Sequence, residues 1–148
     1  MPQTAMNILI INGPNMNMLG IREPDIYGKR TYAQLVETIR AYCEQHGVDC
    51  SFFQSNHEGA IIDAIQGAYG VYDAIVINPA AYTHTSVAIA DALRAVALPA
   101  VEVHLSDVQA REEYRRVSYT AEACLRVIAG RGFDGYTDAV QFLIEKFA

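Results

Sequence analysis

The sequence is poor in basic residues, in cysteine and in long apolar runs, and each shortage excludes a class of protein. Lys and Arg total 11 against 17 Asp and Glu, for a net charge of −6, whereas proteins that bind nucleic acid usually carry a basic face. The three cysteines, Cys43, Cys50 and Cys124, are odd in number and lack Cys-x-x-Cys spacing, so neither a disulfide framework nor a zinc site is indicated. No apolar run approaches the roughly 20 residues that span a bilayer, and residues 1–6 have neither the basic nor the apolar region of a signal peptide. We therefore expect a cytoplasmic protein that binds neither nucleic acid nor membrane.

Glycine-rich phosphate loops are also missing. The stretch Asn12-Gly-Pro-Asn-Met-Asn17 follows the first apolar run but matches neither Gly-x-Gly-x-x-Gly nor the P-loop pattern. A nucleotide or flavin site is therefore disfavoured. His84 and His104 lack a helical His-x-x-x-His spacing, so a metal site built on them is the weaker alternative. We expect no metal and no cofactor.

What the chain does contain is a regular alternation of two hydrophobic periods. Strands are predicted at residues 7–11, 48–55, 74–78, 100–104 and 124–129, and helices at 31–46, 56–70, 86–96 and after 132. Strands that alternate with single helices are parallel and joined by right-handed crossovers. We therefore predict one domain over residues 1–148, an α/β fold with a flavodoxin-like open five-stranded parallel sheet and helices on both faces.

Local signals predict where some helices begin and which side chains they bury. Thr31 and Gln34 fit a capping box, and Asn56 is expected to cap the second helix. Helical spacing places Val87 and Phe147 on buried faces.

Polar residues end three of the predicted strands. Asn12, Asn78 and His104 each follow an apolar run and lead into a polar loop. In open α/β sheets ligands bind beyond the carboxyl ends of the strands. The three side chains are thus expected at one site, the alternative being that each only caps its own loop.

Glu102 and His104 lie two residues apart on a strand, so their side chains leave the same face. A carboxylate bonded to one ring nitrogen fixes the tautomer and prepares the other nitrogen to donate a proton. The pair is therefore a candidate general acid, although Glu-x-His on a strand is a weak signal alone.

The connection from Asn12 to Gly28 is unusually long for a link between a strand and a helix. It carries Arg22 and Tyr27. Tyrosine has an ordinary pKa of about 10, so a tyrosinate base near neutrality needs nearby positive charge. The alternative is a surface loop in which Tyr27 is an exposed aromatic.

Six blocks of this sequence, in the same order, resemble the type II 3-dehydroquinate dehydratases. They are Asn12-Gly-Pro-Asn15, Arg22-Glu-Pro-Asp-Ile-Tyr-Gly28, Gln54-Ser-Asn-His-Glu-Gly59, Ile77-Asn-Pro-Ala-Ala-Tyr-Thr-His-Thr-Ser86, Val101-Glu-Val-His-Leu-Ser106 and Ala110-Arg-Glu112. The resemblance implies a cofactor-free anti-elimination of water from 3-dehydroquinate, a small anionic cyclic hydroxy-acid, to give 3-dehydroshikimate.

The resemblance also implies a role for each matched residue. Tyr27 removes a proton from the carbon beside the ketone, and Arg22 keeps the tyrosine ionised. Asn12 holds the water that stabilises the enolate. His104, oriented by Glu102, protonates the departing hydroxyl.

The family's substrate contacts fall on further residues of this chain, with Asp91 reaching in from a neighbouring subunit. They are Asn78, His84, Asp91, Leu105, Ser106 and Arg115. The family assembly implied is a homododecamer, a tetramer of trimers.

Two positions depart from the family pattern, Ala80 in place of the usual glycine and Asp107 in place of the usual asparagine. Neither removes a proposed catalytic group. Two other functions stay open: a flavodoxin-like binding module without catalysis, and a lyase or isomerase acting on a related cyclic hydroxy-acid. The pathway, biosynthetic shikimate or catabolic quinate, is also open.

Overall fold

Five parallel strands form the centre of the protein, as a computed structural model describing residues 5–21, 25 and 29–148 shows. The strands are β1 (Asn7–Asn12), β2 (Asp49–Gln54), β3 (Ala74–Asn78), β4 (Ala100–His104) and β5 (Arg126–Ala129). They pair in the order β2-β1-β3-β4-β5, the order of a flavodoxin-like sheet. The predicted fold class is confirmed.

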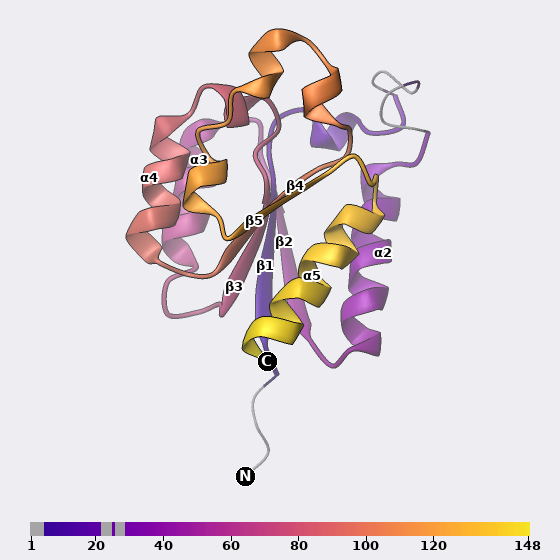
Figure 1. Cartoon of the computed structure of the whole chain (residues 1–148). Coiled ribbons are helices and arrows are strands. Elements are labelled where there is room, and N and C mark those ends of the chain that lie inside the picture. The colour runs from indigo at the N-terminus through magenta and orange to yellow at the C-terminus, as the bar shows by residue number, and fades with distance from the viewer. Residues whose placement is uncertain (1–4, 22–24, 26–28) are drawn as a thin grey trace.

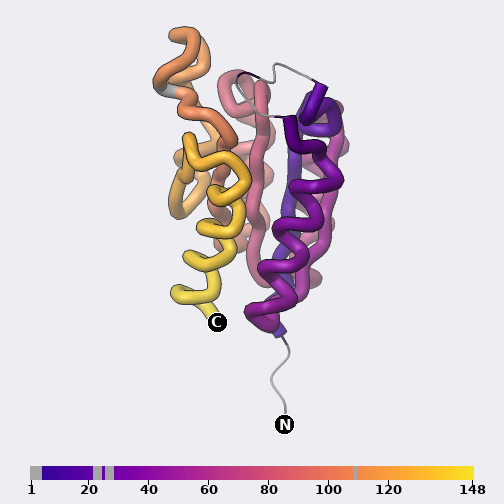
Figure 2. The backbone as a smooth tube through the Cα atoms, turned by 90° about the vertical axis from the view of Figure 1, so that its right-hand side faces the viewer, coloured from indigo at the N-terminus to yellow at the C-terminus, as the bar shows by residue number. Residues whose placement is uncertain are grey.

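Helices cover both faces of the sheet. On one face lie α2 (Tyr32–Gln45) and α5 (Asp134–Phe147), and on the other lie α3 (Glu58–Gly67) and α4 (Val87–Val96). Figure 1 views the sheet nearly along its edge, with α3 and α4 on one side and α2 and α5 on the other. Figure 2, turned by 90°, brings α2 and α5 to the front.

The alternation of side chains along each strand divides the core between these two layers. On β1, Ile8 and Ile10 pack in the cluster that includes α2 and α5, while Leu9 and Ile11 pack in the cluster that includes α3 and α4. All four are at most 5% exposed. A strand covered on both faces is apolar throughout, which explains the unbroken run in the sequence.

The helix predictions held in part. The capping box is confirmed: Thr31 Oγ1 accepts from the Gln34 N–H at 3.2 Å, and Gln34 Oε1 accepts from the Thr31 N–H at 2.8 Å. The Asn56 cap is wrong, since α3 begins one residue later, and Asn56 Oδ1 accepts from a loop N–H at 2.9 Å instead. Val87 and Phe147 are 53% and 46% exposed, because they are the first residue of α4 and the last of α5, beyond the packed turns.

The strand order reverses between β1 and β3, and the polar strand ends meet there. Asn12 and Asn78 are register partners on these two strands, and His104 ends the next one. The 3-10 segments η2 (Ala80–His84), η3 (Val108–Ala110) and η4 (Glu113–Arg116) follow the ends of β3 and β4 and lie over this edge of the sheet (Figure 1). In the part of the chain described, no helix is long and apolar enough to cross a membrane.

Candidate active site

A cavity opens at the carboxyl edge of β1, β3 and β4. Six of the residues predicted from the sequence line it: Asn78, His84, His104, Leu105, Ser106 and Arg115. The remaining walls come from the loop after β1, from η2 and from the segment after β4: Pro14, Asn15, Met16, Ala80, Ala81, Val108 and Arg111. The edge where the sequence predicted a site therefore carries a cavity.

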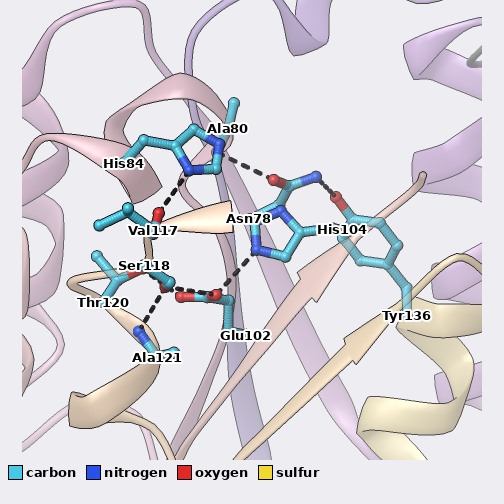
Figure 3. A network of polar contacts seen from close by, with 10 residues as sticks. All are labelled: Asn78, Ala80, His84, Glu102, His104, Val117, Ser118, Thr120, Ala121 and Tyr136. Atoms are coloured by element: carbon cyan, nitrogen blue, oxygen red, sulfur yellow. Dashed lines mark hydrogen bonds and ion pairs between the residues drawn. The ribbon is translucent and has the colours of Figure 1, made fainter. Parts of the chain in front are cut away.

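Glu102 and His104 contact each other, as the dashed line between them in Figure 3 marks, and His104 lines the cavity. His104 Nε2 lies 2.8 Å from Glu102 Oε2, and the two side chains are 6% and 1% exposed. The Thr120 hydroxyl and the Ser118 hydroxyl, the latter at 3.3 Å, also donate to this carboxylate. Ser118 Oγ accepts from the Ala121 N–H at 3.1 Å, so its own proton is directed to Glu102.

Three polar groups, His104 Nε2 and two hydroxyls, thus surround the Glu102 carboxyl group. His104 then donates from Nε2, and Nδ1 is the ring nitrogen left for a bound molecule. A histidine oriented in this way is a candidate for proton transfer with a bound molecule. The sequence analysis missed Ser118 and Thr120, and hydroxyls in a polar segment carry no periodic signal by which to find them.

His84 also lines the cavity, as a neutral hydrogen-bonding group. Its Nδ1 lies 2.7 Å from the Val117 carbonyl oxygen, so Nδ1 carries the proton and Nε2 is an acceptor. Burial lowers the pKa of His84, and the Val117 carbonyl opposes this in part. A neutral imidazole of this tautomer can accept a hydrogen bond from a hydroxyl group.

Two arginines bring positive charge to the cavity. The side chains of Arg111 and Arg115 are only 10% and 17% exposed. Arg115 Nε lies 2.8 Å from Glu112 Oε2, and Arg111 Nε lies 3.7 Å from the same oxygen. Both guanidinium groups line the cavity, and a guanidinium group can bind a carboxylate through two parallel hydrogen bonds.

Asn12 and Asn78 contact the hydroxyl of Tyr136, a fully buried residue of α5. The sequence analysis did not predict this contact. Asn78 Nδ2 donates to Tyr136 Oη at 3.0 Å and contacts Met16 Sδ at 3.5 Å, and its Oδ1 accepts from the Ala80 N–H at 3.0 Å. The Tyr136 hydroxyl donates to Asn12 Oδ1. Asn12 is itself fully buried and stands behind the lining residues.

The structure describes both departures from the family pattern, Ala80 and Asp107. Ala80 has φ of +54°, a left-handed conformation that glycine adopts without steric cost. Asp107 lies against Gly130, where a Cβ would stand 3.4 Å from Asp107 Cβ. The backbone strain therefore lies at the residue whose N–H donates to Asn78 Oδ1.

Three predicted residues lie away from this cavity or outside the described part of the chain. Arg22 and Tyr27 belong to the residues that the structure does not describe. Asp91 lies on α4 with its side chain 69% exposed and 3.6 Å from Arg94 Nη1, and it does not line the cavity. Among the described residues no group of three or more His, Cys, Asp or Glu could hold a metal ion.

Comparisons with known proteins agree on one family. The family model described as "Dehydroquinase class II" matches residues 6–144. The 3-dehydroquinate dehydratase of Clostridium botulinum is 54% identical over 140 residues, which cover 95% of this chain and 95% of that one. The catabolic 3-dehydroquinase of Verticillium alfalfae is 55% identical over 138 residues, with 93% and 92% covered.

Solved structures agree with the sequence comparisons. The crystal structure of the type II dehydroquinase from Butyrivibrio crossotus matches with a TM-score of 0.93 and 51% identity, covering 95% of this chain and 98% of that one. A family model over most of the chain, relatives above 50% identity and a shared fold leave one assignment. This chain belongs to the class II dehydroquinase family.

Proposed function

We propose that this protein removes water from 3-dehydroquinate to give 3-dehydroshikimate, with a tyrosinate as base, an enolate as intermediate and a histidine as acid. Its place among the 3-dehydroquinate dehydratases makes it a hydro-lyase. The observation that carries the mechanism is the buried Glu102–His104 pair, with 2.8 Å between His104 Nε2 and Glu102 Oε2, at a cavity that two arginines also line.

The elimination balances with the groups named. Tyr27, held ionised by Arg22, takes the proton from the carbon beside the ketone, and the electron pair moves into the enolate. Asn12 contributes by holding the water that stabilises the enolate oxygen. The carbon–oxygen bond of the hydroxyl then breaks, and His104 Nδ1 supplies the proton that completes the departing water. Glu102 stabilises the imidazolium before transfer and retains the tautomer afterwards.

Substrate recognition is assigned to the lining residues. Arg115, with Arg111 beside it, faces the carboxylate of the substrate, and His84 Nε2 accepts from a hydroxyl group. Asn78, Leu105 and Ser106 provide the floor of the cavity. Asp91 is proposed to come from a neighbouring chain, which requires the homododecamer expected from the family resemblance.

The direct test is to add 3-dehydroquinate to the purified protein and follow the absorbance of the conjugated enone product. We expect turnover without added metal or nucleotide. His104→Ala should lower kcat by about 10² or more with a small change in KM, since the acid acts on the departing hydroxyl and contributes little to binding. His57→Ala, an exposed histidine before α3, is the matched control and should keep full activity.

Two results would overturn the proposal. A folded wild-type protein that forms no enone would favour the binding-module alternative. Normal turnover by His104→Ala would remove this residue from the mechanism and leave the acid unassigned.

A further inference from the structure

We propose that Tyr136 is a positioning residue that fixes the orientation of the Asn12 and Asn78 side-chain amides, so that Asn12 holds its N–H₂ group in place for the enolate step. The proposal rests on the proposed function for the role of Asn12. Tyr136 itself lies on α5, outside the six sequence blocks that resemble the family.

The direction of every hydrogen bond in this network follows from one backbone amide. The Ala80 N–H can only donate, so the Asn78 atom that faces it at 3.0 Å is the oxygen. Asn78 Nδ2 must then face Tyr136 Oη, at 3.0 Å, as donor. Tyr136 accepts this bond and directs its single proton to Asn12 Oδ1. Asn12 Nδ2 is left on the other side, 3.5 Å from Tyr32 Oη.

The hydroxyl oxygen of Tyr136 joins the two amides, because this one atom accepts from Asn78 Nδ2 and donates to Asn12 Oδ1. A carboxamide has nearly the same shape when it is rotated by 180°, so packing alone does not decide which atom faces a given side. The Ala80 N–H fixes the Asn78 amide with its N–H₂ group toward Tyr136. The hydroxyl proton then finds an acceptor only if Asn12 presents its carbonyl oxygen.

Burial strengthens the preference for this orientation of the Asn12 and Asn78 amides. Tyr136 and Asn12 are fully buried and Asn78 is 3% exposed. Water therefore cannot replace a missing partner without entering the core, and an unpaired buried amide or hydroxyl is costly. Burial also raises the pKa of Tyr136, so the hydroxyl keeps the proton that it donates.

The network spans the point where the strand order reverses. Asn12 ends β1 and Asn78 ends β3 as register partners, while Tyr136 reaches them from the opposite end of the chain, 124 and 58 residues away in sequence. In Figure 3 the Tyr136 ring lies beside Asn78, and Ala80 lies on the other side of Asn78 from the ring. Helix α5, which packs on the sheet, thus orients the polar side chains at the carboxyl edge of the sheet.

Tyr136→Phe tests this inference, because it removes one hydroxyl and keeps the ring that packs in the core. We expect kcat on 3-dehydroquinate to fall roughly 10- to 100-fold, the range for a misplaced group at an active site, with KM nearly unchanged. The matched control is Tyr42→Phe, which also removes a hydroxyl bonded to a side-chain oxygen, that of Gln141, but on helices away from the cavity. It should keep wild-type kcat.

A double-mutant cycle separates positioning from a general loss of stability. If Tyr136 acts through Asn12, then Tyr136→Phe should have little further effect on kcat in an Asn12→Ala background. The same fold-loss in both backgrounds, or an unchanged kcat in the single variant, would overturn the inference. A wild-type protein without activity would instead overturn the proposed function, so the two failures are distinguishable.

If the Tyr136→Phe variant does not fold, two tyrosine analogues provide a second test. At position 136, 4-aminophenylalanine keeps a donor for Asn12, whereas 4-fluorophenylalanine is of similar size and has none. We expect the amino analogue to retain much more turnover than the fluoro analogue. Equal turnover would show that the donor to Asn12 has no positioning role.

Discussion

At the scale of single residues, the site combines one group set up to give a proton with one set up to accept a hydrogen bond. His104 is bonded at Nε2 to a carboxylate and His84 at Nδ1 to a carbonyl oxygen. The first contact fixes which ring nitrogen of His104 faces Glu102, and the second leaves a neutral His84 ring with Nε2 as an acceptor. Two histidines facing one cavity thus take different chemical roles because their partners differ.

The state of His84 gives a prediction for stability against pH. Burial lowers its pKa below the ordinary value of about 6.5, so the unfolded chain binds a proton at this position more readily than the folded protein. The stabilisation is therefore complete above pH 6.5 and is lost as the pH falls from there toward the lowered pKa. In His84→Gln, the fall in Tm between about pH 7 and 5 should be smaller than in the wild type.

Thermal unfolding measured at closely spaced pH values checks this expectation. His57→Gln, at an exposed position, is the control and should follow the wild-type curve. A His84→Gln curve that runs parallel to the wild type would show that His84 does not contribute to this pH dependence.

The residues at the ends of strands could be predicted from the sequence, whereas their supporting partners could not. Asn78 and His104 follow apolar runs, so their place at the cavity follows from the period of the strand and the rule for ligand sites in such sheets. Ser118, Thr120 and Tyr136 contact them from a loop and from a distant helix. Such contacts depend on how the helices pack, and no spacing in the sequence records them.

At the scale of secondary-structure elements, two alanines hold left-handed conformations at the ends of elements. Ala80 follows β3 with φ of +54°, and Ala97 ends α4 with φ of +55°. Residues with a Cβ are less stable than glycine in this region by roughly 1–2 kcal/mol. The two positions carry the same strain but differ in place, since Ala80 lines the cavity and Ala97 is exposed beyond it.

This pair gives a prediction with an internal control. Ala97→Gly should raise the free energy of unfolding by about 1 kcal/mol and leave kcat and KM unchanged. Ala80→Gly should stabilise by a similar amount but alter kcat, because the Ala80 N–H bonds Asn78 Oδ1. Chemical denaturation and steady-state kinetics measure both effects, and a destabilised Ala97→Gly would contradict the strain argument.

The two ends of the connection between β1 and α2, near Gly20 and Lys29, lie close to each other. A Cβ on Gly20 would lie 2.9 Å from the Lys29 carbonyl oxygen, so the two ends of the loop pass in close contact. The Arg30 guanidinium stands 3.9 Å from the centre of the buried Phe133 ring, where a cation–π interaction stabilises it. The loop that carries Arg22 and Tyr27 is therefore anchored at its base.

The anchored loop leads to a prediction about the base. Tyr27→Phe should abolish turnover with little effect on folding. In Arg22→Ala the pKa of Tyr27 should rise, because a nearby positive charge no longer stabilises the tyrosinate. The acidic limb of the rate profile should then move to higher pH as kcat falls. Rates measured across pH for both variants test this, and an active Tyr27→Phe with an unmoved limb in Arg22→Ala would place the base elsewhere.

Capping residues in the sequence predicted the start of a helix correctly where the capping side chain bonds a residue close to it in sequence. The Thr31 capping box involves residues three apart and formed as predicted. Asn56 has the same intrinsic preference for a cap, but its side chain bonds the Asn15 N–H from another loop. A competing tertiary contact thus shifted the start of α3, and the sequence around Asn56 gives no sign of it.

At the scale of the whole molecule, the alternation of strands and helices was enough to predict the sheet. Unbroken apolar runs required helices on both faces, and single crossovers required parallel strands. The order β2-β1-β3-β4-β5 then places the reversal, and with it the cavity, beside Asn12 and Asn78. Contacts between chains could not be predicted in this way, because the hydrophobic pattern of one chain does not show which surfaces meet.

The predicted contribution of Asp91 from a neighbouring chain is testable by mixing variants. Asp91 is 69% exposed and pairs with Arg94 only at 3.6 Å, so Asp91→Ala should fold normally, since such surface pairs contribute little. It should nevertheless raise KM. Glu37→Ala is the matched control, because Glu37 is 70% exposed and pairs with Arg40 at the same spacing on α2.

Co-expression of Asp91→Ala with His104→Ala then decides which chain supplies Asp91 to a given site. If Asp91 acts across an interface, mixed assemblies contain sites that combine His104 of one chain with Asp91 of its neighbour, and these sites should recover wild-type KM and turnover. If Asp91 acts within its own chain, or not at all, the mixture should have only the summed activity of the two variants. Activity of the co-expressed sample, with its mass measured by light scattering against twelve chains of 16.3 kDa, tests the shared site and the dodecamer together.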